Sequence, residues 1–408
     1  MPSEFTYPGV YLEEQSSAGH TIPGVPTSVA AFIGPTRYGP LNRPFEVGSF
    51  SQFEQRFGAR SDALETGHAV RQYFLNGGRQ AWVVRVAKNP TASRFRTGLK
   101  SLDAVKIFNL LVIPGMTSPA VVALAAGYCQ TRRAFLLLDA PASVRTPEQM
   151  EQFTRNLAFD ARSEAAIYYP WIRIANPLAP NRPRLSSPSG TIAGMIARVD
   201  ANRGVWKAPA GTEAILKGVT GLERNLTDAE MGRLNPRGVN CLRSLSGQRW
   251  VAWGARTLAG DDQSAAEFKY IPVRRTALFV EQSLAQGIRW AVFEPNAEPT
   301  WLRLRASVTV FMDALFRQGA LAGTKPKEAY FVKCGRDTTT AADVGAGIVN
   351  VVVGFAPLKP AEFVVIRLRQ SVGSAIPKPA KPKKTRKDSR RATVRRPVDR
   401  RQSAAPRR

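Results

Sequence analysis

The sequence predicts a mixed α/β protein with a central sheet and a strand-like arm at each end. The chain has 408 residues, of which 44% are apolar, so it is long enough to bury a large core in two to three domains. From Leu99 onward, short apolar segments alternate with helical patterns, which is typical of a parallel sheet covered on both faces. A strand-like segment also stands near each end, and a flexible stretch separates each of them from the rest.

The N-terminal arm, residues 1–14, precedes a flexible linker at residues 15–24. Its alternation places Val10 and Leu12 on one face of a strand, and Pro8 is tolerated if that strand lies at a sheet edge. Ten extended linker residues span up to about 30 Å, far enough to reach an adjacent subunit. The segment alone fits equally well as an edge strand of its own domain. The residues expected to pair are Tyr7, Pro8, Gly9, Val10, Tyr11, Leu12 and Glu13.

The C-terminal arm follows a hinge at residues 355–361 that contains two prolines. Two strands on flexible leads allow a protein to complete the sheets of its neighbours, which is a form of β-augmentation. This pattern favours assembly over catalysis. The residues expected to pair are Glu362, Phe363, Val364, Val365, Ile366, Arg367 and Leu368.

Between the linker and Leu99, the chain predicts a β-β-α-α-β order. Asp62 is a suitable N-cap for the second helix, and the residues Asn76 to Gly78 that follow it tolerate left-handed conformations. The expected strands are residues 28–34, 44–48 and 80–87, and the expected helices are 51–57 and 63–75.

After Leu99, the pattern predicts strands at residues 108–113, 134–138 and 165–172, with helices at 119–131 and 147–157 between them. A further helix is expected at 190–200, and a pair of strands within 242–255.

Residues 296–317 predict a long helix near the C-terminus. Its apolar stripe repeats at intervals of three and four residues, as one packed face requires. The other faces carry Arg303, Arg305 and Arg317, which fit either solvated charge or contact with an acidic partner. The stripe consists of Trp301, Leu304, Val308, Phe311 and Leu315.

Composition argues against a membrane span and a secretory signal. The longest apolar runs, such as residues 108–115, are far shorter than the roughly 20 residues needed to cross a bilayer. The N-terminus lacks the basic and apolar regions of a secretory signal, so we expect synthesis in the cytoplasm.

Cysteine and histidine usage argues against several kinds of site. Cys129, Cys241 and Cys334 are far apart and form no CxxC pair, so we expect buried free thiols rather than disulfides or a zinc ribbon. His20 and His68 are the only histidines, which leaves little for a histidine metal site or a Ser-His-Asp arrangement. We therefore assign no catalytic, cofactor-binding or metal-binding residues.

The net charge of +27 is unevenly distributed. Residues 371–408 hold 14 Lys and Arg residues against two Asp residues, so this tail contributes +12 and the rest of the chain +15. The tail has almost no large apolar residues, so we expect it to be disordered when alone. Its basic runs could neutralise phosphates, but it has no aromatic residues to stack on bases. The composition supports an unspecific electrostatic contact and no specific nucleic-acid site.

After nucleic-acid binding, the second alternative function is that of an α/β enzyme. Asp139 ends an apolar strand, the position where doubly wound proteins bind ligands. However, a phosphate loop of the form GxxxxGK[ST] is missing, and the glycine-rich residues 319–325 have the wrong spacing. We interpret Asp139 as a turn or capping residue and expect no enzymatic activity.

A series of short segments stands out along the chain, from about residue 7 to about residue 369. The segments are YPGVY at 7–11, GVPTSVAAFIG at 24–34, GPLN at 39–42, GTIAG at 190–194, RGVWKAPA at 203–210, LNP at 234–236, GVNC at 238–241, WGARTL at 253–258, YIPVRR at 270–275, FEPN at 293–296, QGAL at 318–321 and APLKPAEF at 356–363. In this order they resemble one family, the contractile tail sheath proteins of bacteriophages and related phage-like injection particles, and the order is more specific than any one segment.

The resemblance implies a tail-sheath fold, with a central α/β domain and a second mixed domain built from N- and C-terminal parts. It implies the following division: arm and linker, 1–24; N-terminal part of the sheath domain, 25–98; middle α/β domain, 99–235; C-terminal domain facing an inner tube, 236–358; C-terminal arm, 359–370; basic tail, 371–408. The tail departs from the family pattern, so the resemblance implies nothing about its role.

In function, the resemblance implies a structural subunit without a cofactor. Many copies would form a six-start helix around an inner tube protein, together with baseplate and terminator or cap proteins. Contraction from a metastable extended state would drive the tube through a target envelope. Assembly would take place in a bacterial cytoplasm, in a phage tail or a phage-like injection particle. The positions considered for tube contact are Arg303, Arg305 and Arg317.

Overall fold

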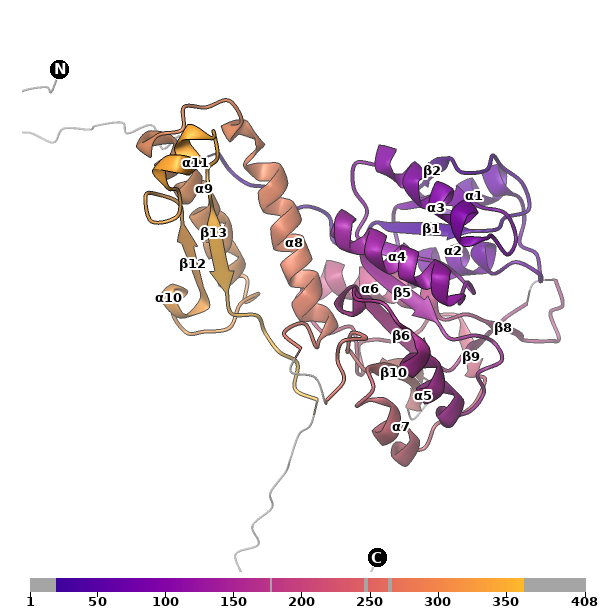
Figure 1. Ribbon diagram of the computed structural model, residues 1–408. Helices are drawn as coiled ribbons and strands as arrows, with labels where there is room; N and C mark the ends of the chain where they lie inside the picture. The colour runs from indigo at the N-terminus through magenta and orange to yellow at the C-terminus, as the bar shows by residue number, and fades with distance from the viewer. Residues whose placement is uncertain (1–19, 177, 246–248, 263–265, 363–408) are drawn as a thin grey trace, which may run out of the picture. The chain divides into compact units, whose positions relative to one another are not determined.

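The computed structural model describes residues 20–176, 178–245, 249–262 and 266–362 (Figure 1). Within these residues, an eight-stranded sheet has the order β11-β10-β6-β5-β4-β1-β3-β2. Neighbouring strands are parallel except at the two edges, where β2 pairs antiparallel with β3 and β11 pairs antiparallel with β10. The mixed α/β class expected from the sequence is confirmed. The strands are β1 (Ala30–Gly34), β2 (Pro44–Val47), β3 (Ala81–Arg85), β4 (Leu110–Val112), β5 (Phe135–Asp139), β6 (Ala165–Tyr169), β10 (Val239–Leu245) and β11 (Arg249–Trp253).

Helices cover both faces of this sheet, which explains why its central strands are apolar throughout. In β5, all five residues are buried. One face packs against α3 (Ala92–Ser101), α4 (Pro119–Arg132), α5 (Pro147–Asn156) and α7 (Asp228–Leu234). The other face packs against α1 (Phe50–Phe57), α2 (Glu65–Asn76) and α6 (Ser189–Arg203).

Helices α2 and α6 meet backbone to backbone. A Cβ atom on Gly190 would lie 2.4 Å from the carbonyl oxygen of Ala69, and one on Gly194 would lie 2.3 Å from that of Tyr73. No side chain fits at either position, so the GTIAG segment at 190–194 is a helix-packing motif.

A three-stranded antiparallel sheet follows β6, in the order β8-β7-β9. The single strand predicted over residues 165–172 is wrong: β6 ends at Tyr169, and β7 belongs to this second sheet. Pro170 lies between them and has no N–H group to continue the ladder. The strands are β7 (Ile172–Ile174), β8 (Arg184–Ser186) and β9 (Val219–Leu222).

Two long helices follow, α8 (Ile271–Gly287) and α9 (Glu298–Arg317). The helix predicted over 296–317 is confirmed, and its apolar stripe is buried. The remaining elements are α10 (Pro326–Ala329), β12 (Tyr330–Lys333), α11 (Ala341–Gly345) and β13 (Val352–Phe355), with short 3-10 helices η1 (Leu102–Ala104), η2 (Arg162–Glu164) and η3 (Arg289–Ala291).

The N-cap predicted at Asp62 is wrong. Helix α2 begins at Glu65 after the N-cap Leu64, which makes no side-chain cap bond. Asp62 instead accepts a hydrogen bond from the Asn176 side chain at 3.3 Å and lies 3.7 Å from the Arg184 guanidinium, so a tertiary contact replaced the local one.

Other expectations are met. The three cysteines are free and buried, and the strand pair expected within 242–255 is β10 and β11. Strands from segments 25–98, 99–235 and 236–358 all join the eight-stranded sheet, and the domain boundaries between these segments stay predictions. In the part of the chain that the structure describes, no helix is long and apolar enough to cross a membrane.

Candidate functional site

A two-stranded antiparallel sheet, β12 with β13, is the candidate site. Tyr330 pairs with Phe355 at one end of it, and Lys333 pairs with Val352 at the other. No third strand joins it within the described residues. Both outer edges therefore present backbone N–H and C=O groups that lack a strand partner.

The two faces of this small sheet differ. The inner face packs on α9 and its surroundings through Tyr330, Val332, Val353 and Phe355. On the outer face, Phe331 is 50% exposed and lies over Gly354, where a Cβ atom would be 2.2 Å from the Phe331 ring. The sheet is thus packed on one face, and no described strand pairs with either of its outer edges.

The first described residue, His20, and Pro357 after β13 lie near opposite ends of α9. The His20 ring lies 4.3 Å from the ring of Trp290, which precedes α9, and Trp301 of α9 packs in the same cluster as Trp290. At the other end, Pro357 forms a bridge with Leu321, shortly after α9 ends. A helix of 20 residues is about 30 Å long, so the contacts of His20 and Pro357 are well separated.

The arm residues themselves lie largely outside the described residues. This applies to the whole predicted N-terminal set, from Tyr7 to Glu13, and to Phe363–Leu368 of the C-terminal set. Glu362 is the last described residue. Pairing of the arms therefore stays a prediction.

The three arginines considered for tube contact have different surroundings. Arg303 donates to Glu294 at 2.6 Å and lies over the Trp290 ring at 5.4 Å, so its charge is engaged within the fold. Arg317 pairs with Asp313 one helical turn away, but its side chain is 79% exposed. Arg305 is exposed. Arg305 and Arg317 are thus the more accessible two.

Sequence reasoning missed two buried ion pairs at the start of α8. Arg275 donates to both carboxylate oxygens of Asp200 in α6, at 2.9 and 2.6 Å. Arg274 donates to Glu164 at 2.8 Å, and that carboxylate is also buried. The YIPVRR segment was noted only as part of the resemblance. Two adjacent arginines at the start of an apolar helix were the available signal.

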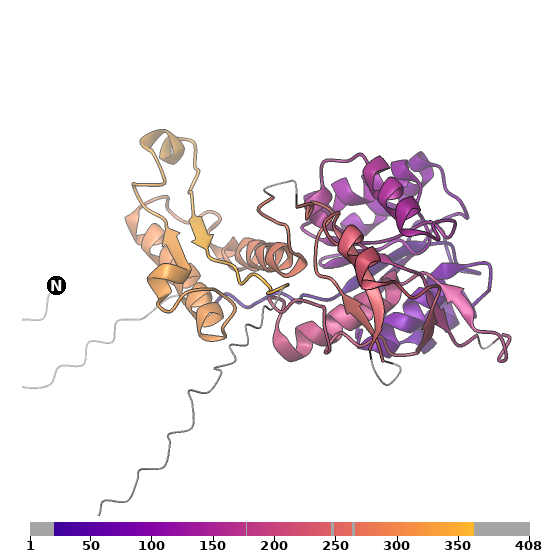
Figure 2. The same ribbon diagram turned by 90° about the horizontal axis from the view of Figure 1, so that it is seen from below.

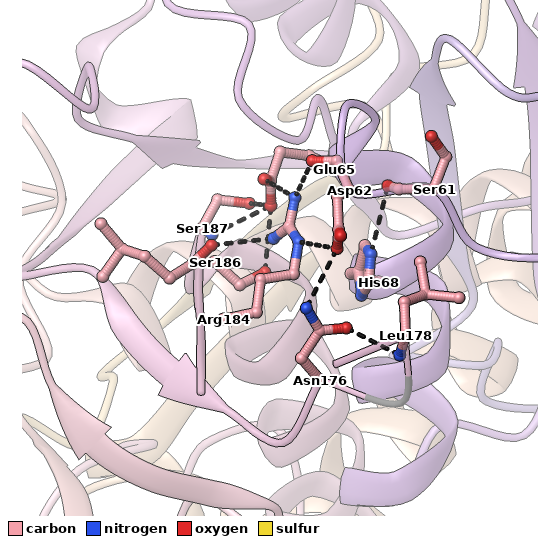
Figure 3. A network of polar contacts seen from close by, with 10 residues as sticks. Ser61, Asp62, Glu65, His68, Asn176, Leu178, Arg184, Ser186 and Ser187 are labelled. Atoms are coloured by element: carbon pink, nitrogen blue, oxygen red, sulfur yellow. Dashed lines mark hydrogen bonds and ion pairs between the residues drawn. The ribbon is translucent and has the colours of Figure 1, made fainter. Parts of the chain in front are cut away.

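A polar network surrounds Glu65 at the start of α2 (Figure 3). One carboxylate oxygen accepts a bond from Arg184 at 2.5 Å. The other accepts bonds from the Ser186 hydroxyl at 3.0 Å and the Ser187 amide at 3.2 Å. Both carboxylate oxygens of Glu65 thus accept hydrogen bonds from residues of the same fold. The network joins α2 to β8 and does not offer a ligand site.

Histidine 68 lies beside this network (Figure 3). Burial, with a smaller contribution from the nearby Arg184 charge, lowers the pKa of His68 from 6.5 to about 4. Its Nε2 atom lies 3.3 Å from the Ser61 carbonyl oxygen. His68 is therefore neutral at physiological pH and belongs to the core.

Asp139 lies at the carboxyl end of β5, as predicted, and its acceptors are in use. It accepts bonds from the Ser189 amide at 2.9 Å, the Ser189 hydroxyl at 2.7 Å and the Gly115 amide at 3.1 Å. Burial raises the pKa of Asp139 to about 6, although these hydrogen bonds oppose the rise. Ser189 is the first residue of α6, which agrees with a capping role.

The described side chains were also compared with the requirements of a metal centre. Within the described ranges, no group of three or more His, Cys, Asp or Glu side chains is placed to hold a metal ion.

Comparison with known proteins gives one consistent family. The family model for the phage tail sheath protein central domain matches residues 88–258, and the model for the phage tail sheath C-terminal domain matches residues 263–371. A putative prophage major tail sheath protein of Pseudomonas aeruginosa (strain UCBPP-PA14) is 29% identical over 283 residues, which are 67% of this chain and 68% of that protein.

Solved structures similar to this chain are also contractile sheaths. The sheath of an extracellular contractile injection system, PVC, in its contracted state is 32% identical, with a TM-score of 0.74 over 91% of this chain and 99% of that one. The contracted helical sheath of the anti-feeding prophage, AFP, is 29% identical, with a TM-score of 0.73 over 90% of this chain and 100% of that one.

Proposed function

This chain belongs to the phage tail sheath protein family and is a structural subunit of a contractile sheath, and from this premise we propose that its terminal arms join neighbouring copies through the β12–β13 sheet. The observation that carries the proposal is the open pair of edges on that sheet. The chain has two arms, and the sheet has two edges. An isolated two-stranded sheet is marginally stable in water, so added strands would stabilise it.

The arms have the alternation that such pairing requires. Val10 and Leu12 in one arm, and Val364, Ile366 and Leu368 in the other, would lie on the inner face next to the apolar cluster under β12 and β13. Backbone pairing would supply the affinity, while the apolar side chains would fix the register.

The course of the chain after β13 favours exchange with a neighbour. The Ala322 amide donates to the Ala356 carbonyl at 2.9 Å, and Pro357 forms its bridge with Leu321. These contacts carry the chain onward beyond β13 instead of turning it back along that strand.

The polymer that follows is a helix of copies, and we infer that it surrounds an inner tube, as the family resemblance implies. Segment 236–358 would face the tube, with the accessible Arg305 and Arg317 in contact with acidic tube residues. Arg303 would instead hold Glu294 and Trp290 in place. Baseplate and terminator or cap proteins would bound the polymer at its ends.

In this scheme, the extended polymer is a trapped state and the contracted one gains contacts between subunits. The arms keep the copies linked while they move. Assembly in a bacterial cytoplasm agrees with this role.

We further propose that the chain catalyses no reaction. Family membership supports a structural role, and Asp139, the residue that invited an enzyme interpretation, already has its hydrogen-bond acceptors in use. The basic tail at 371–408 would make unspecific contacts inside the particle.

Truncation tests the arm proposal. A chain that starts at residue 15, or one that ends at residue 359, should fold but form no long sheaths in negative-stain electron micrographs. A chain that ends at residue 370 is the matched control, because it lacks only the basic tail and should polymerise normally. Long regular sheaths from either arm truncation would refute the proposal.

Charge reversal tests the tube contact separately. Arg305→Glu and Arg317→Glu together should reduce co-purification with a co-expressed tube protein while leaving the fold intact. Unchanged recovery of the tube would show that other residues make this contact.

A further inference from the structure

Residues 20–27 form an extended segment, here called the strap, that lies along α8. As the strap runs forward, its contacts run backward along the helix: His20 packs on Trp290 just after α8, Ile22 lies at Gly287, and Thr27 accepts a hydrogen bond from Arg275. Figure 2 shows the indigo strap beside this helix. The strap is therefore laid antiparallel to α8 over most of its length.

Two of the strap's eight residues are buried and five are exposed, and the strap has no regular secondary structure. Ile22 is 6% exposed and Val25 is 8% exposed. The Val25 amide donates to the Ser283 hydroxyl at 3.1 Å, which satisfies a backbone group that burial would otherwise leave unpaired.

Gly287 makes room for the strap at its N-terminal end. A Cβ atom at this position would lie 2.4 Å from Cγ2 of Ile22 and 2.9 Å from its Cβ. The backbone of Gly287 is helical, so the requirement for glycine comes from the close approach of Ile22 and not from an unusual φ.

Arg275 connects the other end of the strap to two helices. The same guanidinium group that holds Asp200 of α6 also donates to the Thr27 carbonyl oxygen at 2.9 Å. The Arg275 side chain is 3% exposed and that of Asp200 is 2% exposed. One buried group thus ties the strap to α8 and to α6.

We propose that the strap is a clamp that fixes where the N-terminal arm leaves the subunit and passes tension on the arm into α8 and α6. This inference rests on the arm exchange proposed above. Residues 20–24, predicted as part of the flexible linker, are thus held on α8, which leaves residues 15–19 as the linker to the arm at residues 1–14. Release of the eight strap residues would lengthen the flexible chain between the arm and the subunit by up to roughly 26 Å. The effective concentration of the arm at the β12–β13 sheet of the neighbouring copy would then fall.

Two glycine substitutions provide a matched test. Gly287→Ala should displace Ile22, whereas Gly127→Ala in α4 adds the same methyl group to a helix at a position with no heavy atom within 4 Å. Hydrogen exchange followed by mass spectrometry would report on the Val25 amide in the unassembled full-length chain. We expect exchange roughly tenfold faster in Gly287→Ala and unchanged in Gly127→Ala.

Electron microscopy of the same variants gives the second readout. We expect shorter or fewer sheaths from Gly287→Ala and normal sheaths from Gly127→Ala. Arg275→Lys keeps the charge but cannot hold both Asp200 oxygens and Thr27 in one planar fork, so it should also free the strap.

The outcomes separate the two proposals. Continued protection of Val25 in Gly287→Ala would overturn the clamp, and so would normal sheaths from a variant whose strap is released. If the arm truncations still assemble, the exchange of arms fails instead, and the exchange rate of Val25 still decides whether the strap is seated as described.

Discussion

The eight-stranded sheet and the β12–β13 sheet differ in how far their faces are covered and their edges protected. Both faces of the large sheet are covered, and its edges are protected: residues 211–216 donate to and accept from β11, and Pro44 and exposed Glu46 lie on the edge strand β2. Among the described residues, the small sheet has one covered face and no strand paired to either outer edge. The first region contains its own stabilising contacts, whereas the second leaves backbone groups to which we have proposed that the arms of other copies pair.

This difference predicts where substitutions should act. Changes inside the large α/β region should lower the free energy of unfolding of the single subunit. Changes on the small sheet should leave the subunit folded and act on polymerisation. The following substitutions test that division, from the largest expected change in stability to the smallest.

Asp200→Asn should have the largest effect, because it leaves the buried Arg275 guanidinium without its charged partner. Removing one member of a buried pair costs about 3–5 kcal/mol, which urea denaturation of the unassembled chain would measure. Asp313→Asn is the control: it removes the partner of the exposed Arg317 and should cost about 0–1 kcal/mol. Similar losses in both variants would contradict the distinction between buried and surface pairs.

His68→Gln should change how stability depends on pH. The unfolded chain protonates His68 below pH 6.5, but the folded chain does so only near pH 4, so folding stability falls as the pH drops between these values. The wild type should lose roughly 2–3 kcal/mol more than the variant by pH 4. Denaturation of both chains at pH 7 and pH 4 measures this, and Asp139 titrates equally in both. Parallel pH profiles would show that His68 is protonated in the fold.

Gly194→Ala should separate α2 from α6, because the new Cβ atom would meet the Tyr73 backbone. Overpacking of this kind costs about 1–3 kcal/mol. Gly127→Ala, with open space around it, should instead stabilise its helix by up to about 1 kcal/mol. Thermal unfolding distinguishes the two variants. Higher stability in both would indicate that α2 and α6 can move apart freely.

Phe331→Ser should have the smallest effect on the subunit, because the side chain is half exposed on the outer face of the small sheet. We expect a change of less than about 1 kcal/mol in unfolding but a clear loss of sheaths in electron micrographs. Leu41→Ser, at a similarly exposed position before β2, should leave both unchanged. A strongly destabilised Phe331→Ser subunit would show that the small sheet supports the fold itself.

Sequence periodicity identified elements with strong local signals. The stripe of α9 and the apolar run of β5 each predicted an element that the structure contains, because burial of one helix face, or of both strand faces, imposes a visible pattern. Boundaries set by tertiary contacts were predicted less well. Asp62 has the right chemistry for an N-cap, yet it interacts with Asn176 and Arg184 far along the chain.

The sequence by itself determined the α/β class and the family, because these depend on composition, order and short-range periodicity, whereas the two strand-like arms stay a prediction. Only the tertiary structure revealed that no third strand joins β12 and β13 in the described part of the chain, that Arg275 connects the strap with α8 and α6, and that Asp139 accepts hydrogen bonds from Ser189 and Gly115. Such contacts join residues that are tens to hundreds of positions apart. Local pattern carries no information about which of them meet, since the packing of the whole chain decides it.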